Sequence, residues 1–245
     1  MGIKHAFTST KDQGSDSSLV SKDEWNADHV GEPYPSESPD APADSPNAMD
    51  DEFVGGSLDA KWTTHLHASA TATVSASHLG LWAPYNVQTR NIYVTQPAPS
   101  GTWRVRAKLS IDGTFWNHHL VGLIAQRGSG DSTKTVTAQF GYWSSQQGTL
   151  LGCRYTKADA SQIDYEGDLY NTQFPFYAEL EYDGTNVIFR SSVSGAFYGQ
   201  IWKETVATHL GGAPEQVGIM FVHYPTDNST NCEPYATADW FRRMA

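Results

Sequence analysis

Two carboxylates at alternate positions, Glu179 and Glu181, are spaced so that they could do chemistry together. Residues two apart in a strand point to the same face, and retaining glycoside hydrolysis uses two carboxyl groups about 5 to 5.5 Å apart. The same spacing suits a solvated strand face on which carboxylates pair across strands with Arg104, Arg106 or Arg190. We favour ion pairing, predict no catalytic residue and expect that the chain is not an enzyme. A glycan depolymerase using Glu179 or Glu181 is an alternative.

Histidines and acidic residues offer few metal ligands. His65 and His67 share one predicted strand face, whereas a structural zinc site needs four ligands. The acidic segment 164–168 could supply oxygen ligands to calcium, but a solvated loop is the simpler interpretation. No serine nucleophile elbow, phosphate-binding loop or dinucleotide glycine motif is present. We therefore predict no metal site and no cofactor, and we keep calcium as the open alternative.

Aromatic side chains are the best candidates for contact with a ligand. Sugars stack their apolar faces on exposed rings while nearby polar groups bond their hydroxyls. For each of these residues the alternative is packing in the core or at a sheet edge. The residues that we predict to bind carbohydrate are Trp143, Gln139, Trp116, Trp82, Tyr85 and Tyr224.

Charge and composition exclude several classes of function. The chain has 245 residues and a formal net charge of -11. Residues 1–50 hold three lysines against ten acidic residues, so duplex nucleic acid is excluded as a partner and a basic protein surface is favoured. No apolar run approaches the roughly 18 residues that a membrane span needs, so we expect no membrane insertion. We expect Cys153 and Cys232 to be buried free thiols in a protein that is assembled in a cytoplasm.

The chain divides into three segments. Residues 1–30 are polar with a few separated hydrophobes, and residues 31–49 contain five prolines, which prevent a helix or a central strand. Residues 50–245 alternate strand-like runs with turn signals. In the run 103–109, Trp103, Val105, Ala107 and Leu109 oppose charged residues, which is typical of a half-buried antiparallel strand. We predict an all-β fold, a two-sheet antiparallel jelly-roll sandwich, preceded by an extended N-terminal arm.

Thirteen strands are predicted within this sandwich. Their ranges are 62–67, 71–77, 79–82, 91–94, 102–111, 120–126, 135–143, 150–156, 176–182, 186–192, 196–202, 216–222 and 235–241.

Two segments resemble known families. The opening Asp51-Glu52-Phe53 … Ser57-Leu58-Asp59 … Lys61-Trp62 and the closing Ala238-Asp239-Trp240-Phe241-Arg242 resemble the concanavalin A-like jelly roll of laminin-G-type modules and lectins, in which the first and last strands lie side by side. The stretch His5-Ala6-Phe7-Thr8 … Ser18-Leu19-Val20 … Glu24-Trp25-Asn26-Ala27-Asp28-His29 resembles the N-termini of tailed-phage structural proteins, although Phe7 stands where those proteins usually have histidine.

These resemblances imply a virion protein, assembled in the host cytoplasm. A spike, fibre or decoration subunit would attach to other virion proteins through residues 1–30 and present a lectin-like domain to a host surface glycan. We expect it to form a homo-oligomer on the particle. A purely structural capsid or tail protein is the alternative. The expected anchoring residues are Ile3, Phe7, Leu19, Val20, Trp25 and His29.

Overall fold

A computed structural model describes the backbone of most of the chain after residue 46. The described residues are 47–67, 69–84, 92–112, 119–129, 132–145, 148–159, 163–170, 176–223 and 235–244. Residues 42–245 form one compact unit. The expected anchoring residues and the proline-rich segment up to residue 46 lie outside the described residues, so the predicted division of the N-terminal region stays a prediction.

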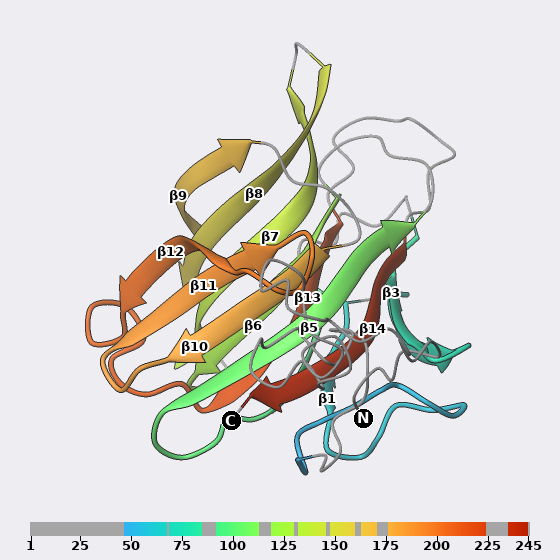
Figure 1. Cartoon of the computed structure of the whole chain (residues 1–245), viewed down its shortest axis with the longest axis horizontal. Helices are drawn as coiled ribbons and strands as arrows, with labels where there is room; N and C mark the ends of the chain where they lie inside the picture. The colour runs from blue at the N-terminus through green and yellow to red at the C-terminus, as the bar shows by residue number, and fades with distance from the viewer. Residues whose placement is uncertain are drawn as a thin grey trace, which may run out of the picture. The chain divides into compact units, whose positions relative to one another are not determined.

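The described residues form fourteen strands in two antiparallel sheets, which confirms the predicted all-β sandwich (Figure 1). One sheet, which we call the front sheet although it lies behind the other in the view of Figure 1, has the order β1 (Thr63–His65), β4 (Ile92–Pro97), β13 (Gln216–His223), β6 (His119–Arg127), β7 (Lys134–Ser145), β8 (Gly148–Asp159) and β9 (Ile163–Tyr170). The back sheet has the order β12 (Gly199–Thr205), β11 (Asn186–Ser192), β10 (Phe176–Tyr182), β5 (Trp103–Asp112), β14 (Tyr235–Met244), β3 (His78–Trp82) and β2 (Thr71–Ser75). No helix among these described residues is long and apolar enough to span a membrane.

The core lies between the two sheets and follows the alternation in the sequence. In β5, Val105, Ala107 and Leu109 are fully buried, while the arginines and the lysine between them are only partly buried. The front sheet contributes Leu123 and Phe140 to the same core. Side chains on alternate faces of a strand explain how one strand serves the core and the surface together.

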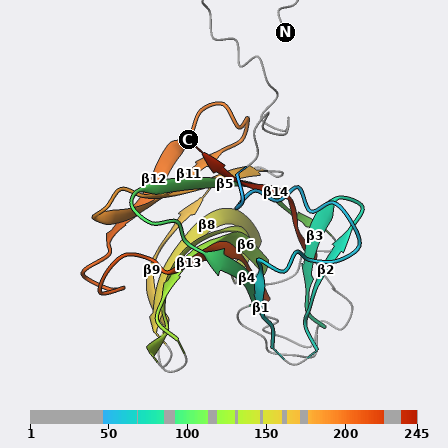
Figure 2. The same cartoon turned by 90° about the horizontal axis from the view of Figure 1, so that it is seen from below.

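The front sheet is curved. Figure 2 shows it arching, with its hollow side turned away from the back sheet. Gly122 in β6 and Gly218 in β13 lie on this hollow side, because they alternate with core residues. A Cβ atom added at Gly122 would lie 1.9 Å from the backbone oxygen of Ala138. One added at Gly218 would lie 1.9 Å from the backbone oxygen of Val94. Glycine therefore permits the close approach of neighbouring strands on the crowded side of the curve.

The first and last strands do not lie side by side as the jelly-roll resemblance implies, because β1 pairs with β4 and β14 belongs to the other sheet; the segment before β1 is tied to β14 instead. Asp51 and Phe241 exchange two backbone hydrogen bonds of 2.8 Å. The Trp62 ring packs edge-on against Phe241, with ring centroids 5.2 Å apart, and its Nε1 donates to Asp51 Oδ2 over 2.7 Å. Glu52 accepts two hydrogen bonds from Arg242. The opening and closing motifs of the sandwich thus stabilise each other.

One predicted loop is a strand. The acidic segment 164–168 was expected to be a solvated loop, but it belongs to β9, which pairs with β8 at the edge of the front sheet. The backbone ladder holds β9, and its register shifts between Tyr155 and Thr156 of β8. The sequence of β9 does alternate, with Ile163, Tyr165 and Leu169 opposed to Asp164, Glu166 and Asp168, but its acidic composition favoured the interpretation as a loop.

Candidate functional site

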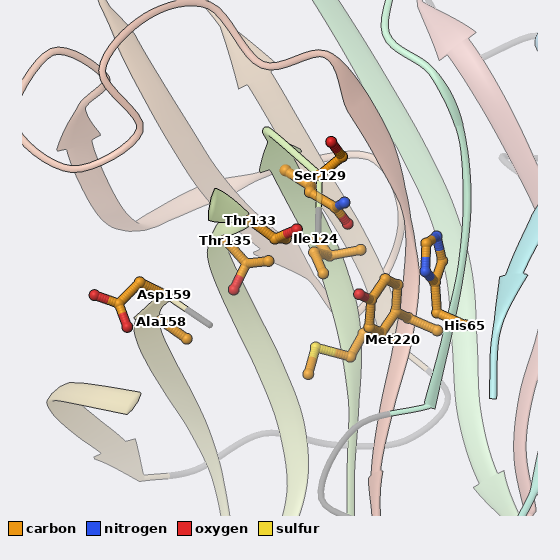
Figure 3. A pocket seen from close by; sticks show the side chains of 10 residues that line it. His65, Ile124, Ser129, Thr133, Thr135, Ala158, Asp159 and Met220 are labelled. Atoms are coloured by element: carbon orange, nitrogen blue, oxygen red, sulfur yellow. The ribbon is translucent and has the colours of Figure 1, made fainter. Parts of the chain in front are cut away.

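A pocket of about 480 Å³ opens on the hollow side of the front sheet (Figure 3). Its walls come from six strands of that sheet and from the loop between β6 and β7. A volume of this size lies in the range of small-ligand sites, about 300 to 1,000 Å³. The lining residues are His65, Tyr93, Ile124, Gln126, Ser129, Thr133, Thr135, Ala158, Asp159 and Met220.

Strand alternation places these side chains in the hollow. Tyr93 lies between Ile92 and Val94, which face the core, and Ile124 lies between the core residues Leu123 and Ala125. The order β1-β4-β13-β6-β7-β8 then sets the lining residues of separate strands next to one another. Tyr93, Ile124 and Met220 are outward partners of core positions, so the same alternation that builds the core places them in the pocket. Asp159 directly follows the lining residue Ala158 and lies at the end of β8.

One wall of the pocket is aromatic. His65 and Tyr93 are cross-strand partners, and their rings stack with centroids 4.3 Å apart and planes 16° apart. A hydrogen bond of 3.1 Å joins His65 Nε2 to Thr95 Oγ1. Burial lowers the pKa of His65 and raises the pKa of Tyr93. Both rings are therefore held in their neutral forms at neutral pH, which suits contact with the apolar face of a ligand.

Polar groups complete the lining. Gln126 in β6 is opposite Gln216 in β13, and neither side-chain Oε1 accepts a hydrogen bond although both oxygens are buried. His209 Nε2 lies 3.1 Å from the carbonyl of Thr135 and 3.0 Å from that of Ala158, and so holds β7 and β8 together beside the pocket. The lining combines an aromatic wall, two aliphatic side chains and a few placed hydrogen-bonding groups.

Gln139 supports the pocket from its own sheet. Its Nε2 donates to Thr137 Oγ1 over 2.8 Å and to the Met220 sulfur over 3.4 Å, and Thr137 is bonded to Thr156 over 2.7 Å. The side chain is only 2% exposed. Gln139 thus positions Met220, which lines the pocket. Its predicted direct contact with a carbohydrate stays a prediction.

The structure does not bring Trp82 together with Gln139. Trp82 lies in β3 of the back sheet, and its ring stacks on Tyr235 with centroids 6.3 Å apart. Trp116, Tyr85 and Tyr224, and the side chain of Trp143, lie outside the described residues. Sequence reasoning missed the pocket residues themselves, because Tyr93 and Gln126 look like ordinary outward positions of a strand. The alternation around Tyr93 was the one signal available.

The two carboxylates with candidate spacing lie in the back sheet and are bound by arginines. Glu179 accepts hydrogen bonds of 2.7 Å from Arg106 and from Arg190, and it is 2% exposed. Glu181 accepts a bond of 2.5 Å from Arg190 and lies 3.8 Å from Arg104. The predicted cross-strand ion pairing is therefore confirmed. Glu179 is buried within the cluster, however, and not solvated as expected.

The pKa of Arg190 shows the effect of its pairing with the two carboxylates. Burial by itself lowers the pKa of Arg190, but hydrogen bonds to Glu181 and Glu179 outweigh that effect and hold the pKa above its usual value. Among the described side chains, no group of three or more His, Cys, Asp or Glu residues could hold a metal ion. The side chains of the segment 164–168, the alternative calcium site, are outside that set.

Comparisons by sequence found no relative: no family model matches the chain, and no curated protein matches it. Comparisons by structure found many. The GH43 BlXynB protein from Bacillus licheniformis has a TM-score of 0.59 and 16% identity over 80% of this chain and 39% of its own. A xylan beta-1,4-xylosidase from Bacillus halodurans has a TM-score of 0.58 and 16% identity over 82% of this chain and 40% of its own. This chain thus spans about two fifths of the length of each.

A third solved structure matches over nearly its whole length. LamAcat from Zobellia galactanivorans has a TM-score of 0.50 and 11% identity over 82% of this chain and 98% of its own. At such identities the likeness establishes a shared fold. The expectation that the chain is not an enzyme is contradicted, because a chain named as a xylosidase carries this sandwich. Pairing of Glu179 and Glu181 with arginines was too narrow a basis for excluding catalysis in the whole molecule.

Proposed function

We propose that the hollow side of the front sheet binds a glycan in the pocket beside the His65–Tyr93 stack. The observation that carries this proposal is the joint presence of a neutral aromatic wall and of placed polar groups in one concave site. Pyranose rings present apolar faces to aromatic side chains and hydroxyls to amides and carboxylates. The fold that the chain shares with a xylan beta-1,4-xylosidase supports the same class of ligand.

The test compares two aromatic substitutions. Binding of xylo-oligosaccharides and of a wider panel of glycans to the full chain is measured by calorimetry and on an array. Tyr93→Ala should weaken binding roughly three- to tenfold, because an aromatic stack contributes about 0.5 to 1.5 kcal/mol. The control is Phe197→Ala, an aromatic that is 87% exposed in the loop between β11 and β12 of the back sheet.

Two outcomes would reject glycan binding at this pocket. One is the absence of any bound glycan on the panel. The other is a bound glycan whose affinity is unchanged by Tyr93→Ala and reduced by Phe197→Ala, since the ligand would then sit on the back sheet.

Hydrolysis of the bound glycan is a second candidate function, favoured by the shared fold and by a carboxylate in the pocket. Asp159 lines the pocket and would supply one of the two carboxyl groups that glycoside hydrolysis uses. Release of reducing ends from xylan and from β-glucans is the measurement. Release that is lost in Asp159→Asn and kept in Glu181→Gln supports hydrolysis at the pocket. No release by the unmodified chain rejects it for these substrates.

The N-terminal residues carry a separate proposal, that residues 1–30 attach the chain to a phage particle. Its support is the resemblance of Trp25-Asn26-Ala27-Asp28-His29 to the N-termini of tailed-phage structural proteins. On this proposal the glycan belongs to a host surface and the chain is a spike, fibre or decoration subunit. A chain without residues 1–30 should remain folded yet be absent from assembled particles. Incorporation of the shortened chain would reject the proposal.

A further inference from the structure

We infer that the pocket selects uncharged glycans, and that Gln126 binds them by accepting a hydrogen bond from a ligand hydroxyl. The inference rests on the proposed glycan binding and names the chemical class of the ligand.

Gln126 is a buried acceptor that the protein leaves unsatisfied. Its side chain is 5% exposed and lines the pocket, and its Oε1 has no hydrogen-bond partner. Buried polar groups are nearly always hydrogen-bonded, and an unmade bond is costly. Gln216, directly opposite on β13, has an unsatisfied Oε1 as well. Gln216 is not among the lining residues, so it is the oxygen of Gln126 whose donor would arrive with a ligand in the pocket.

The chemistry of the missing partner follows from the inventory of donors. A sugar hydroxyl donates one hydrogen bond, so it satisfies an amide oxygen. Carboxylate and sulfate groups only accept hydrogen bonds, so such a group cannot take the place of the hydroxyl at the oxygen of Gln126. The terminal torsion of a glutamine side chain is broad, which lets the amide turn toward a hydroxyl in the pocket at little cost.

The charge of the lining acts in the same direction. Asp159 is the lining residue with a formal charge, and the lining contains no lysine or arginine. Arg127, which ends β6 next to Gln126, is paired with Glu215 over 3.5 Å. An anionic sugar would therefore lose hydration on entering the pocket without gaining a cation from the lining, and this is unfavourable.

The experiment pairs two ligands with three variants of the full chain. The ligands are a neutral xylo-oligosaccharide and the same oligosaccharide bearing a glucuronic acid, with affinities measured by calorimetry. The neutral ligand should bind at least about tenfold more tightly, which corresponds to about 1.4 kcal/mol. Gln126→Met, which keeps side-chain volume and removes the acceptor, should weaken neutral binding by roughly the same factor.

The matched control is Gln200→Met, an exposed glutamine in β12 of the back sheet, which should bind as the unmodified chain does. Thermal unfolding of each variant separates loss of binding from loss of folding. Removal of an unsatisfied buried oxygen should leave the midpoint of Gln126→Met at or above that of the unmodified chain.

Three outcomes decide the question. Equal or tighter binding of the glucuronic-acid ligand, still lost in Tyr93→Ala, overturns the selectivity and keeps glycan binding. A folded Gln126→Met chain that binds like the unmodified chain overturns the role of the amide. Failure of both ligands and of the wider glycan panel rejects the proposed function together with this inference.

Discussion

At the residue scale, the stacked pair His65 and Tyr93 shows how burial tunes a surface for its ligand. A histidine in water is partly protonated near pH 6.5, yet burial lowers the pKa of His65. The ring is thus kept neutral, apolar in character and available for stacking. The hydrogen bond to Thr95 fixes its orientation without requiring a charge.

This burial makes the stability of the fold depend on pH. Because the pKa of His65 is lower in the folded state than its usual value of 6.5, the unfolded chain takes up the proton first as the pH falls. The stabilisation is therefore complete above about pH 6.5 and is lost as the pH falls through the folded-state pKa. His65→Phe keeps an aromatic ring and removes the titration.

Urea unfolding at pH 7.5 and pH 5 measures the effect. Between these two conditions the free energy of unfolding should fall more for the unmodified chain than for His65→Phe. An identical fall in both proteins would show that His65 is not held neutral by burial.

At the element scale, ion pairs as well as backbone hydrogen bonds join the strands of the back sheet. Glu179 in β10 is bonded to Arg106 in β5 and to Arg190 in β11, which are its two direct cross-strand neighbours. Removal of one member of a buried pair leaves an uncompensated charge, and the cost is about 3 to 5 kcal/mol. Exposed pairs contribute only about 0 to 1 kcal/mol.

Two matched substitutions separate these cases. Glu179→Gln should lower the free energy of unfolding by about 3 to 5 kcal/mol. Glu215→Gln, whose carboxylate is exposed and lies 3.5 Å from Arg127, should lower it by about 1 kcal/mol or less. Chemical denaturation of both variants at pH 7 is the measurement. Equal small effects would mean that the cluster is not part of what stabilises the back sheet.

At the scale of the whole molecule, the sandwich includes the segment just before its first strand. Residues 42–245 form one compact unit, and Phe53 is fully buried in its core. The backbone pairing of Asp51 with Phe241 closes the same region. Truncation from the N-terminus can therefore show which residues belong to the folded sandwich and which precede it.

Two truncations test where the sandwich begins. Removal of residues 1–41 should leave a folded domain with an unchanged unfolding midpoint. Removal of residues 1–54 also removes Phe53 and the pairing of Asp51, and loss of a buried phenylalanine side chain alone costs about 3 to 5 kcal/mol. Thermal unfolding followed by near-ultraviolet circular dichroism reports both. Equal midpoints for the two truncated chains would contradict the role of the segment 47–54 in the core.

Much of the fold was determined by the sequence itself. Alternation in β5 and β10 indicated both the strands and their charged outer faces, because a strand exposes successive residues to opposite sides. The pairing of Glu179 with Arg106 and Arg190 followed from the same periodicity. The edge strand β9 escaped detection although its sequence alternates, because its three closely spaced carboxylates were interpreted as an acidic loop.

The pocket was decided by the tertiary structure. Its residues lie between His65 and Met220 in the sequence, and only the strand order of the front sheet and its curvature bring them together. Local pattern shows that Tyr93 and Gln126 point away from the core. Whether an outward face is hollow or open depends on long-range pairing between strands, which no local window of sequence contains.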